Sequence, residues 1–365
     1  MTASCATGAP YLMLDLEAFE RNVAQLADTI VVRGKKCWRP HVKAIRSPRL
    51  AQRLIAAGAS GVTCSSVPEA EAMVGAGIDE VLISSQVIGP DRIRRLALLN
   101  RSANVISAID SLAHIALLAA AAADADVVLP VVIEVDIGLG RAGVAPGPAA
   151  ALLAREVLAN RRLRFCGLMA WEGQTTQIQD QVAKEAAIRA SVGLLTDTAR
   201  RCEAAGISVE IVSCGGTGTY PVTSTIDGVT EIQAGGGVFG DVRYRTEFNM
   251  PLTQALTLNA TVISRPTSRR IVCDAGWKSH GFHPTPSRPL GLAGAVRMLY
   301  GAEHLTLNCD QEQPDFAVGS RIALAVGYAD STVFLHRELW AVRHGEVEEI
   351  LALPAHCEAG GAVLC

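Results

Sequence analysis

Eight short apolar segments alternate with helix-like segments over the first two thirds of the chain, and this alternation constrains the fold most strongly. The strand-like segments are Lys36–Lys43, Gly61–Ser66, Glu80–Gln86, Asn104–Asp110, Val128–Asp136, Phe165–Glu172, Val209–Cys214 and Glu231–Val238. Between most of them, apolar residues recur at the 3.6-residue spacing of an amphipathic helix. Eight such units predict a (β/α)8 TIM-type barrel, with a doubly wound parallel sheet as the alternative.

The pattern changes after Asn249, where strand-like segments follow one another without intervening helices. These segments are Leu256–Ser264, Arg270–Cys273, Arg321–Val326 and Thr332–Arg343, and the proline-rich stretch His283–Gly291 is expected to be a surface loop. The change predicts a second, smaller C-terminal β domain. We therefore expect a barrel over residues 12–248 and a β domain over residues 249–365, joined by about the first 11 residues.

The composition indicates a globular protein without a nucleic-acid or membrane partner. Of the 365 residues, 49% are hydrophobic and 19% are charged, and the net charge of -3 offers no field that attracts polyanions. No apolar run reaches the roughly 18 residues of a membrane span, and Met1–Pro10 does not look like a secretory signal. Cys64, Cys166, Cys214 and Cys273 lie in apolar runs, which predicts buried free thiols in a reducing cytoplasm.

Lysine and glycine residues mark the end of the barrel where a site is expected. Functional groups in such barrels gather at the carboxyl ends of the strands, and Lys43 ends the first strand-like segment. A lysine desolvated there becomes a nucleophile toward an aldehyde, although a solvated strand-end lysine is the simpler interpretation. The runs Cys214–Thr219 and Gly235–Gly237 follow the seventh and eighth strands, where phosphate sites are frequent in this fold.

Six collinear segments resemble a known family. They are Tyr11–Asn22, Arg39–Lys43 (RPHVK), Val67–Glu71, Glu134–Gly143 (EVDIGLGRAG), Gly215–Tyr220 (GGTGTY) and Gln233–Gly235. Together they resemble the D-threonine aldolase and D-serine dehydratase group of fold-type III, alanine-racemase-like enzymes, which use pyridoxal 5'-phosphate (PLP). The resemblance spans most of the chain, and it is specific as a set although no single segment is.

The resemblance implies a role for each matching residue. Lys43 would bind PLP as a Schiff base and transfer protons, and Arg141 would hydrogen-bond the phenolic oxygen of the cofactor. Trp171 would stack on the pyridine ring, and Gln233 would lie near the pyridine nitrogen. The phosphate would be held by Gly216, Thr217, Gly235 and Gly236. Glu172 stands where the group has a histidine, and it is either a general acid or base or a salt-bridge partner of an arginine.

The expected metal ligands differ from those of the group, whose members carry a divalent metal bound by a His-x-Asp or His-x-Cys motif. The matching segment here is Gly327–Thr332, in which Tyr328 replaces the histidine while Asp330 remains. Tyrosine is a poor ligand at neutral pH because its pKa is near 10. We therefore expect no metal of the usual kind, with Asp330 as the ligand if one binds. The histidines His280, His283, His304 and His336 are further candidates, or simply surface or hydrogen-bonded residues.

The resemblance implies a lyase acting on a small D- or β-hydroxy amino acid. Aldol-type cleavage or formation of the Cα–Cβ bond ranks first, and dehydration ranks second. Racemisation, with Tyr328 as a second base, ranks third, and Tyr328, Asp330 and Glu172 are the acid–base candidates beside Lys43. The family also implies a homodimer with its active site at the interface. A non-catalytic PLP carrier and a sugar-phosphate enzyme without PLP are the alternatives from other classes.

Overall fold

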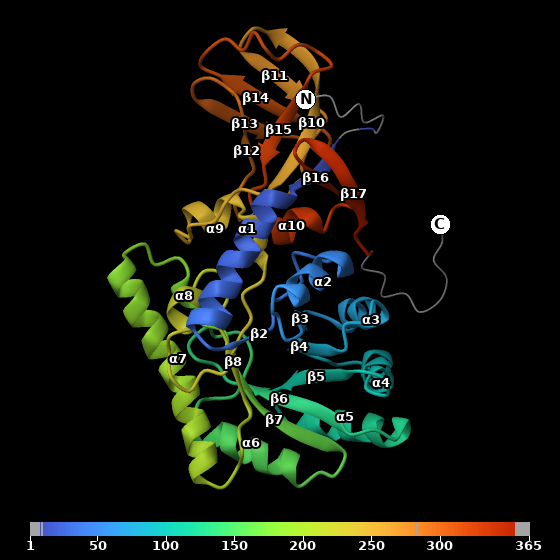
Figure 1. Ribbon diagram of the computed structural model, residues 1–365, viewed down its shortest axis with the longest axis vertical. Helices are drawn as coiled ribbons and strands as arrows, with labels where there is room; N and C mark the ends of the chain where they lie inside the picture. Colours follow the sequence, from blue (N-terminus) through green and yellow to red (C-terminus); the bar gives the residue numbers. More distant parts are fainter. Residues whose placement is uncertain (1–7, 9, 282–283, 355–365) are drawn as a thin grey trace. The chain divides into compact units, whose positions relative to one another are not determined.

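The computed structural model describes residues 8, 10–281 and 284–354, which pack into two compact units. The barrel unit comprises Ala24–Gly235, and the strand unit comprises the described residues up to Val23 together with Gly236–Pro354 (Figure 1). The domain boundaries expected near residues 12 and 249 stay a prediction, because compact packing does not measure which segments fold together.

The barrel unit is built on an eight-stranded parallel sheet. Its strands are β2 (Cys37–Trp38), β3 (Val62–Cys64), β4 (Glu80–Gln86), β5 (Asn104–Ile109), β6 (Leu129–Glu134), β7 (Leu163–Met169), β8 (Ile211–Cys214) and β9 (Glu231–Ile232). The order β2-β9-β8-β7-β6-β5-β4-β3 leaves β2 and β3 at its edges. A parallel bridge between His41 and Thr63 joins those edges, because Val42 N–H donates to Thr63 O at 2.8 Å. The predicted TIM-type barrel is confirmed.

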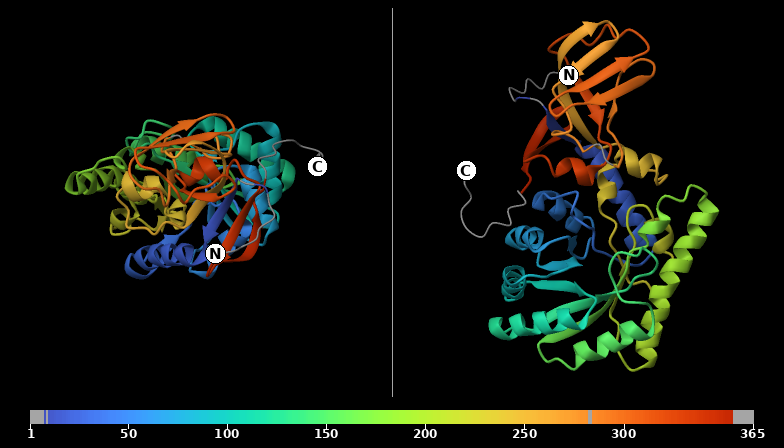
Figure 2. Two further views of the ribbon diagram at one scale, coloured as in Figure 1. Left: turned by 90° about the horizontal axis from the view of Figure 1, so that it is seen from above. Right: turned by 180° about the vertical axis from the view of Figure 1, so that it is seen from behind.

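Helices cover the outside of these strands, and in Figure 1 and the right-hand view of Figure 2 they follow one another around the sheet. They are α1 (Leu16–Ala27, shared with the strand unit), η1 (Asp28–Arg33), α2 (Pro48–Ala56), α3 (Val67–Gly75), α4 (Pro90–Leu99), α5 (Leu112–Ala125), α6 (Pro148–Leu158), η2 (Gly173–Thr175), α7 (Gln181–Ala204) and α8 (Tyr220–Thr223). Side chains of Ser66, Ser111 and Asp180 cap α3, α5 and α7 by accepting backbone N–H groups.

The barrel interior is filled from neighbouring strands. One buried cluster joins Leu82, Ile106, Ala108, Val132, Cys166 and Met169, which come from β4, β5, β6 and β7. Strands β5, β6 and β7 are buried over most of their length, as expected for a parallel sheet covered on both faces, and β4 is buried at Val81–Ile83. Cys64, Cys166, Cys214 and Cys273 are buried free thiols, which confirms their predicted state.

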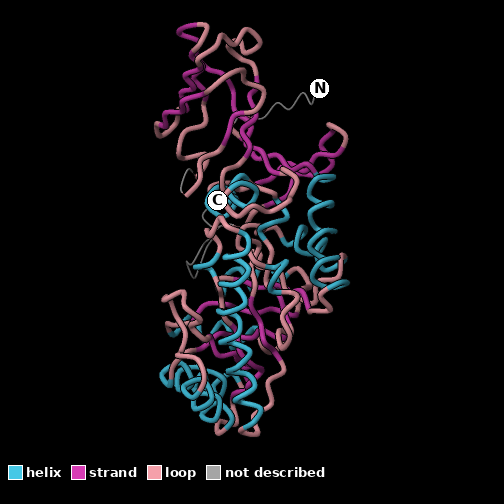
Figure 3. Tube along the Cα trace, turned by 90° about the vertical axis from the view of Figure 1, so that its left-hand side faces the viewer, coloured by secondary structure: helices cyan, strands magenta, loops and turns pink. Residues whose placement is uncertain are grey.

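The strand unit contains a mostly antiparallel sheet, and strands dominate it in Figure 3. Its elements are β1 (Tyr11–Asp15), η3 (Gly236–Phe239), α9 (Val242–Thr246), β10 (Leu256–Thr267), β11 (Arg270–Cys273), β12 (Arg288–Pro289), β13 (Val296–Tyr300), β14 (Leu305–Cys309), β15 (Arg321–Ala325), α10 (Ala329–Val333), β16 (Glu338–Arg343) and β17 (Glu346–Ala352). The main path runs β13-β14-β11-β10-β1-β16-β17. The first described strand thus pairs with β10 and β16.

Two sequence predictions are wrong in this unit. The segment Thr332–Arg343 is not one strand, because Thr332 and Val333 end helix α10 and only Glu338–Arg343 is extended. The expected loop at His283–Gly291 contains the short strand β12, which pairs with β15, while His283 lies outside the described residues. A proline is tolerated in β12 because β12 is an edge strand. Within the described ranges, no helix is both long and apolar enough to cross a bilayer.

Candidate active site

Lys43 lies just beyond the first strand, in a turn at the carboxyl end of the barrel. The ladder from β2 continues to Val42, and the Ile45 N–H then donates back to Val42 O at 2.9 Å, which places Lys43 in the turn. The Lys43 side chain is exposed. Of the two alternatives for this lysine, a desolvated and a solvated strand-end residue, the structure has the solvated one, because the turn carries it outside the packed interior. Its proposed role does not depend on burial, since an exposed amine can still reach an aldehyde.

His41 lies beside Lys43 and is fixed in one tautomer by its contacts. The Lys43 N–H donates to His41 Nδ1 at 3.4 Å, and His41 Nε2 lies 3.2 Å from Ser84 Oγ at the end of β4. Since Nδ1 accepts, Nε2 carries the proton and donates to Ser84, whose hydroxyl donates to Cys64 O at 3.4 Å. Burial, with the nearby charges of Lys43 and Arg141, holds the pKa of His41 well below its usual value. The ring is therefore neutral.

Arg141 is held by a loop that folds back on β6. Asp136 Oδ1 accepts the N–H groups of Gly138 and Gly140 at 3.0 and 3.1 Å, and Val144 pairs with Val135. The Arg141 side chain is exposed, and its Nη2 lies 3.4 Å from Glu134 Oε1. Glu134 is buried at the end of β6 and also accepts from Gln86 Nε2 at 2.5 Å. A buried carboxylate thus orients the arginine at the barrel mouth.

Trp171 and the glycines after β8 and β9 are placed by close packing. A Cβ on Gly216 would lie 2.3 Å from Trp171 Cη2, and a Cβ on Gly235 would lie 2.2 Å from His41 O. Each glycine is therefore required by neighbouring protein atoms, whatever ligand the loop holds. The Gly216 N–H donates to Thr219 Oγ1 at 3.1 Å, and Thr217 is buried.

Gln233 points into a buried polar network below the mouth of the barrel. Its Nε2 donates to Ser213 Oγ at 2.9 Å, and Ser213 Oγ donates to Glu231 Oε1 at 2.8 Å. Glu231 Oε2 accepts from Arg39 Nε at 2.8 Å, and both charged side chains are buried. The amide of Gln233 is therefore oriented by a chain that ends in a buried ion pair.

Glu172 is fully buried, and its contacts are with the loop after β8. The carboxylate accepts from the Gly215 N–H and from the hydroxyl groups of Thr219 and Thr223. All three donors are neutral, so these contacts do not make Glu172 the salt-bridge partner of an arginine.

In the strand unit, Tyr328 and Asp330 form a hydrogen-bonded pair. Tyr328 OH donates to Asp330 Oδ2 at 2.9 Å, and the Arg243 guanidinium lies 5.1 Å from the centre of the Tyr328 ring. Burial and the nearby Asp330 carboxylate raise the pKa of Tyr328 far above its usual value. Gly236, at the start of η3, packs on Tyr244, since a Cβ there would lie 2.8 Å from Tyr244 OH.

Buried Asp241 fixes the loop that carries Tyr328. Its two carboxylate oxygens accept the N–H groups of Tyr244 and Ala329 at 3.0 and 2.8 Å. Burial is the main cause that raises the pKa of Asp241 to about 8, and Asp330 adds to it.

The candidate histidines of the strand unit have structural contacts. His280 is buried with Nδ1 3.2 Å from Ser287 Oγ, and His336 Nε2 lies 2.6 Å from Ser279 O. His304 is exposed, and His283 lies outside the described residues. Among the described residues, no group of three or more His, Cys, Asp or Glu side chains could hold a metal ion.

Sequence reasoning gave no role to four polar residues at the barrel mouth: His41, Ser84, Gln86 and Glu134. Ser84 and Gln86 end β4, and Glu134 ends β6. The signal that could have found them is a polar residue at the carboxyl end of an apolar strand. Their contacts position Lys43 and Arg141 from the neighbouring strands.

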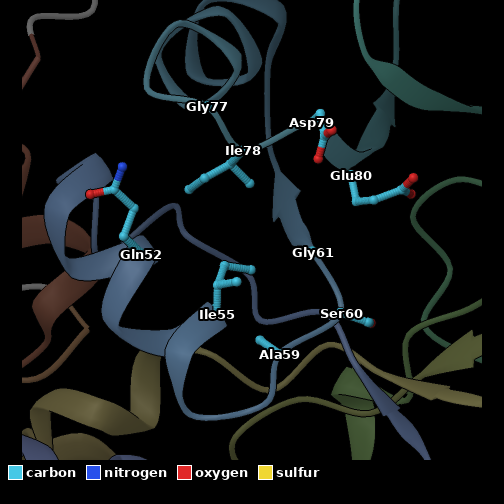
Figure 4. Close-up of a pocket in the computed structure, with 9 residues that line it drawn as sticks. All are labelled: Gln52, Ile55, Ala59, Ser60, Gly61, Gly77, Ile78, Asp79 and Glu80. Carbon is cyan, nitrogen blue, oxygen red and sulfur yellow. The ribbon is translucent and has the colours of Figure 1, made fainter.

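The opposite end of the barrel carries a small hollow of about 180 Å³ (Figure 4). Figure 4 shows Gln52 and Ile55 of α2 facing the Gly77–Glu80 turn that leads into β4. This hollow lies where β3 and β4 begin, so it is separate from the residues that follow the strands' carboxyl ends.

Comparison with known proteins identifies the class to which this fold and site belong. The chain matches the family described as alanine racemase, N-terminal domain, over residues 14–243, and the putative serine dehydratase domain over residues 255–342. The first match covers more than half of the chain, which is therefore a member of the alanine-racemase-like family.

Full-length relatives specify the group within that family. A D-threonine aldolase from Arthrobacter sp. is 31% identical over 351 residues, covering 95% of this chain and 92% of the relative. A 3-hydroxy-D-aspartate aldolase from Paracoccus denitrificans (strain Pd 1222) is 29% identical over 364 residues, covering 95% and 91%. The crystal structure of D-threonine aldolase from Filomicrobium marinum superposes with a TM-score of 0.91 and 32% identity over 95% of each chain. The chain thus belongs to the group that contains the D-threonine aldolases and D-serine dehydratase-like enzymes, which confirms the family that its sequence motifs predicted.

Proposed function

We propose that this chain is a PLP-dependent lyase that cleaves or forms the Cα–Cβ bond of a small D- or β-hydroxy amino acid. The observation that carries the proposal is the gathering of Lys43, His41 and Arg141 at one end of the barrel, in a chain related over its whole length to D-threonine aldolase.

The residues at this end suit PLP in their chemistry. The cofactor combines an aldehyde with an anionic phosphate and a phenolic oxygen, and the mouth offers a primary amine, a guanidinium and a flat indole. When bound, PLP supplies a ring that stabilises negative charge at the substrate Cα.

Each residue then has a defined task. Lys43 Nζ would hold the aldehyde of the cofactor and serve as the proton-transfer group, while the neutral His41 ring supports the turn that carries Lys43. Arg141, steadied by Glu134, would hydrogen-bond the phenolic oxygen, and Trp171 would stack on the pyridine ring. Gln233 would lie near the pyridine nitrogen, and the backbone at Gly216, Thr217 and Gly235 would hold the phosphate.

Tyr328 and Asp330 do not fit a divalent metal site. The phenol donates its proton to the one carboxylate of the motif, so it offers no anionic ligand. The Arg243 guanidinium over the same ring adds a positive charge beside the place where a cation would bind. We propose that the Tyr328–Asp330 pair takes the place of the metal motif of the family, with the phenol kept protonated as a hydrogen-bond donor and Asp330 as the proton acceptor.

Dehydration is the second candidate reaction. The observation that favours it is the match of residues 255–342 to the putative serine dehydratase domain. Both reactions develop negative charge at Cα. Aldol cleavage removes the proton of the β-hydroxyl group and breaks the Cα–Cβ bond, whereas dehydration removes the Cα proton and breaks the Cβ–O bond.

The deciding experiment incubates purified protein and PLP with a panel of D- and L-β-hydroxy amino acids. Glycine and an aldehyde as products would support aldol cleavage, whereas ammonia and a keto acid would support dehydration. A protein that neither absorbs visible light with PLP nor turns over any member of the panel would refute the proposal. A yellow protein without turnover would instead indicate a PLP carrier.

A further inference from the structure

The Glu172 carboxylate is one of the most completely surrounded charged groups of the barrel unit. Its side chain has no exposed surface, and all three of its hydrogen-bond donors belong to the segment Gly215–Thr223. Oε1 accepts from Thr223 Oγ1 at 2.7 Å and from Thr219 Oγ1 at 2.8 Å, and Oε2 accepts from the Gly215 N–H at 3.2 Å. A buried carboxylate that loses a hydrogen-bond donor costs free energy. Any movement of the Gly215–Thr223 segment away from Glu172 is therefore unfavourable, and the carboxylate holds this segment in place.

The contacts extend from Glu172 to the backbone of the glycine loop. Thr219 Oγ1, which donates to Glu172, accepts the Gly216 N–H at 3.1 Å. Thr219 also begins the short helix α8 as its capping residue, and Thr223 ends it. One carboxylate therefore contacts both ends of α8. It also binds the Gly215 N–H directly and the Gly216 N–H through the Thr219 hydroxyl.

Trp171, the residue before Glu172, also packs against the glycine loop. A Cβ on Gly216 would lie within 2.5 Å of two atoms of the Trp171 ring, so the indole and the loop backbone are in direct contact. The dipeptide Trp171–Glu172 after β7 thus determines the conformation of the dipeptide Gly215–Gly216 after β8. Those strands are neighbours in the barrel, which explains how residues some 43 positions apart meet.

We propose that Glu172 is a positioning residue that sets the shape of the Gly215–Thr219 loop for the cofactor phosphate and transfers no proton itself. The inference rests on the proposed PLP-dependent function, and it replaces the acid–base role that the sequence suggested for this carboxylate. Each oxygen of Glu172 is directed at a loop donor, which leaves substrate chemistry to other groups.

The test compares binding of PLP with binding of pyridoxal, which has the same aldehyde and ring but no phosphate. We expect Glu172→Gln to weaken PLP about tenfold and pyridoxal by less than about twofold, because an amide nitrogen cannot accept from the Gly215 N–H. Thr223→Val should act in the same direction, and Thr223→Ser, which keeps the hydroxyl, should restore binding. Equal weakening of PLP and pyridoxal, or equal defects in the Val and Ser variants, would overturn the proposal.

Two further readouts separate positioning from other roles. The pH profile of kcat/KM in Glu172→Gln should keep the shape of the wild-type profile, and loss of one limb would instead show that Glu172 transfers a proton. Amide hydrogen exchange of residues 215–220 should be faster in the cofactor-free variants than in the cofactor-free wild-type protein. Unchanged exchange would contradict the proposal. If Glu172→Gln folds poorly, Thr223→Val alone decides this measurement. If the wild-type protein binds no PLP, the proposed function fails, while the exchange measurement still decides whether Glu172 orders the loop.

Discussion

The indole of Trp171 lies against the Cα of Gly216, leaving no room for even one methyl group between them. A Cβ on Gly216 would approach Cη2 to 2.3 Å, and a Cβ on Gly173 would approach Nε1 to the same distance. The orientation of the ring is therefore set by two glycine backbones. A flat surface held this rigidly suits stacking on a cofactor ring.

Replacing Gly216 by alanine should displace the Trp171 ring. We expect a loss of roughly 1–3 kcal/mol in the free energy of unfolding from overpacking, together with weaker PLP binding. Gly193→Ala is the matched control, because a Cβ in this part of α7 meets nothing within 4 Å and should stabilise the protein by about 0.5–1 kcal/mol. Denaturant unfolding and cofactor titration measure both effects, and similar behaviour of the two variants would contradict this account.

Lys43→Ala should abolish the visible absorbance of bound PLP and all turnover, while the unfolding transition stays where it is. The lysine side chain is exposed, so its removal leaves no cavity. Lys35→Ala, at another exposed lysine of the barrel unit, should leave absorbance unchanged. Borohydride reduction followed by peptide mapping locates the attachment, and finding PLP on a different lysine would refute the assignment.

The buried Asp241 carboxyl should make the strand unit less stable as the pH rises. Its pKa is about 8 in the folded protein against 3.8 in an unfolded chain, so the folded state binds the extra proton. Stability is greatest below the unfolded value and falls by about 1.4 kcal/mol per pH unit between about pH 5 and 8. In Asp241→Asn, the free energy of unfolding should no longer fall with pH in this range. Loss of the hydrogen bond from the Ala329 N–H should also lower the stability of the variant, by an amount that does not itself depend on pH. Parallel pH curves for the two proteins would show that Asp241 is not the group responsible.

Metal removal should distinguish this chain from a metal-dependent lyase. We expect exhaustive EDTA treatment to leave turnover nearly intact, and Asp330→Asn to lower turnover without releasing any metal. Tyr328→His should create a His-x-Asp pair and with it measurable binding of Mn²⁺ or Zn²⁺ by calorimetry. Loss of activity with EDTA and its return with Mn²⁺ or Zn²⁺ would disprove the metal-free proposal, and Asp330 would then be the first ligand to examine.

A homodimer is the assembly that we propose from the family resemblance. Light scattering of the PLP-bound protein should give twice the chain mass at concentrations used for assays. Activity should fall on dilution in step with dissociation, because the resemblance implies an active site that a second subunit completes. A fully active monomer would exclude this assembly.

The barrel could be predicted from the sequence, whereas half of the strand unit could not. Parallel strands such as β6 (LPVVIE) are buried on both faces and read as continuous apolar runs. By contrast, β17 (EVEEILA) is an edge strand with mostly exposed residues, and only its pairing with β16 makes it extended. β13 was missed for the same reason, since it lies at the other edge of the sheet and none of its residues is buried.

Some residues of the site could be predicted from their position in the sequence, whereas their contacts depend on how the chain packs. Lys43, Arg141 and Trp171 follow strand ends and could be named from that position alone. The contacts of Glu172 could not be foreseen, because its donors lie 43 to 51 residues away and meet it only through the pairing of β7 with β8.

The buried pair of Arg39 and Glu231 restricts which side chains are accepted at position 233, which we propose lies near the cofactor nitrogen. Ser213 donates its only hydroxyl proton to Glu231, so it presents a lone pair to position 233. An amide donor is accepted there, but a carboxylate would meet a lone pair with a second negative charge close behind it. A Gln233→Glu substitution that aimed to keep the ring protonated would therefore fail alone. Such a redesign would also have to replace the residues that form the hydrogen-bonded chain from Ser213 through Glu231 to Arg39.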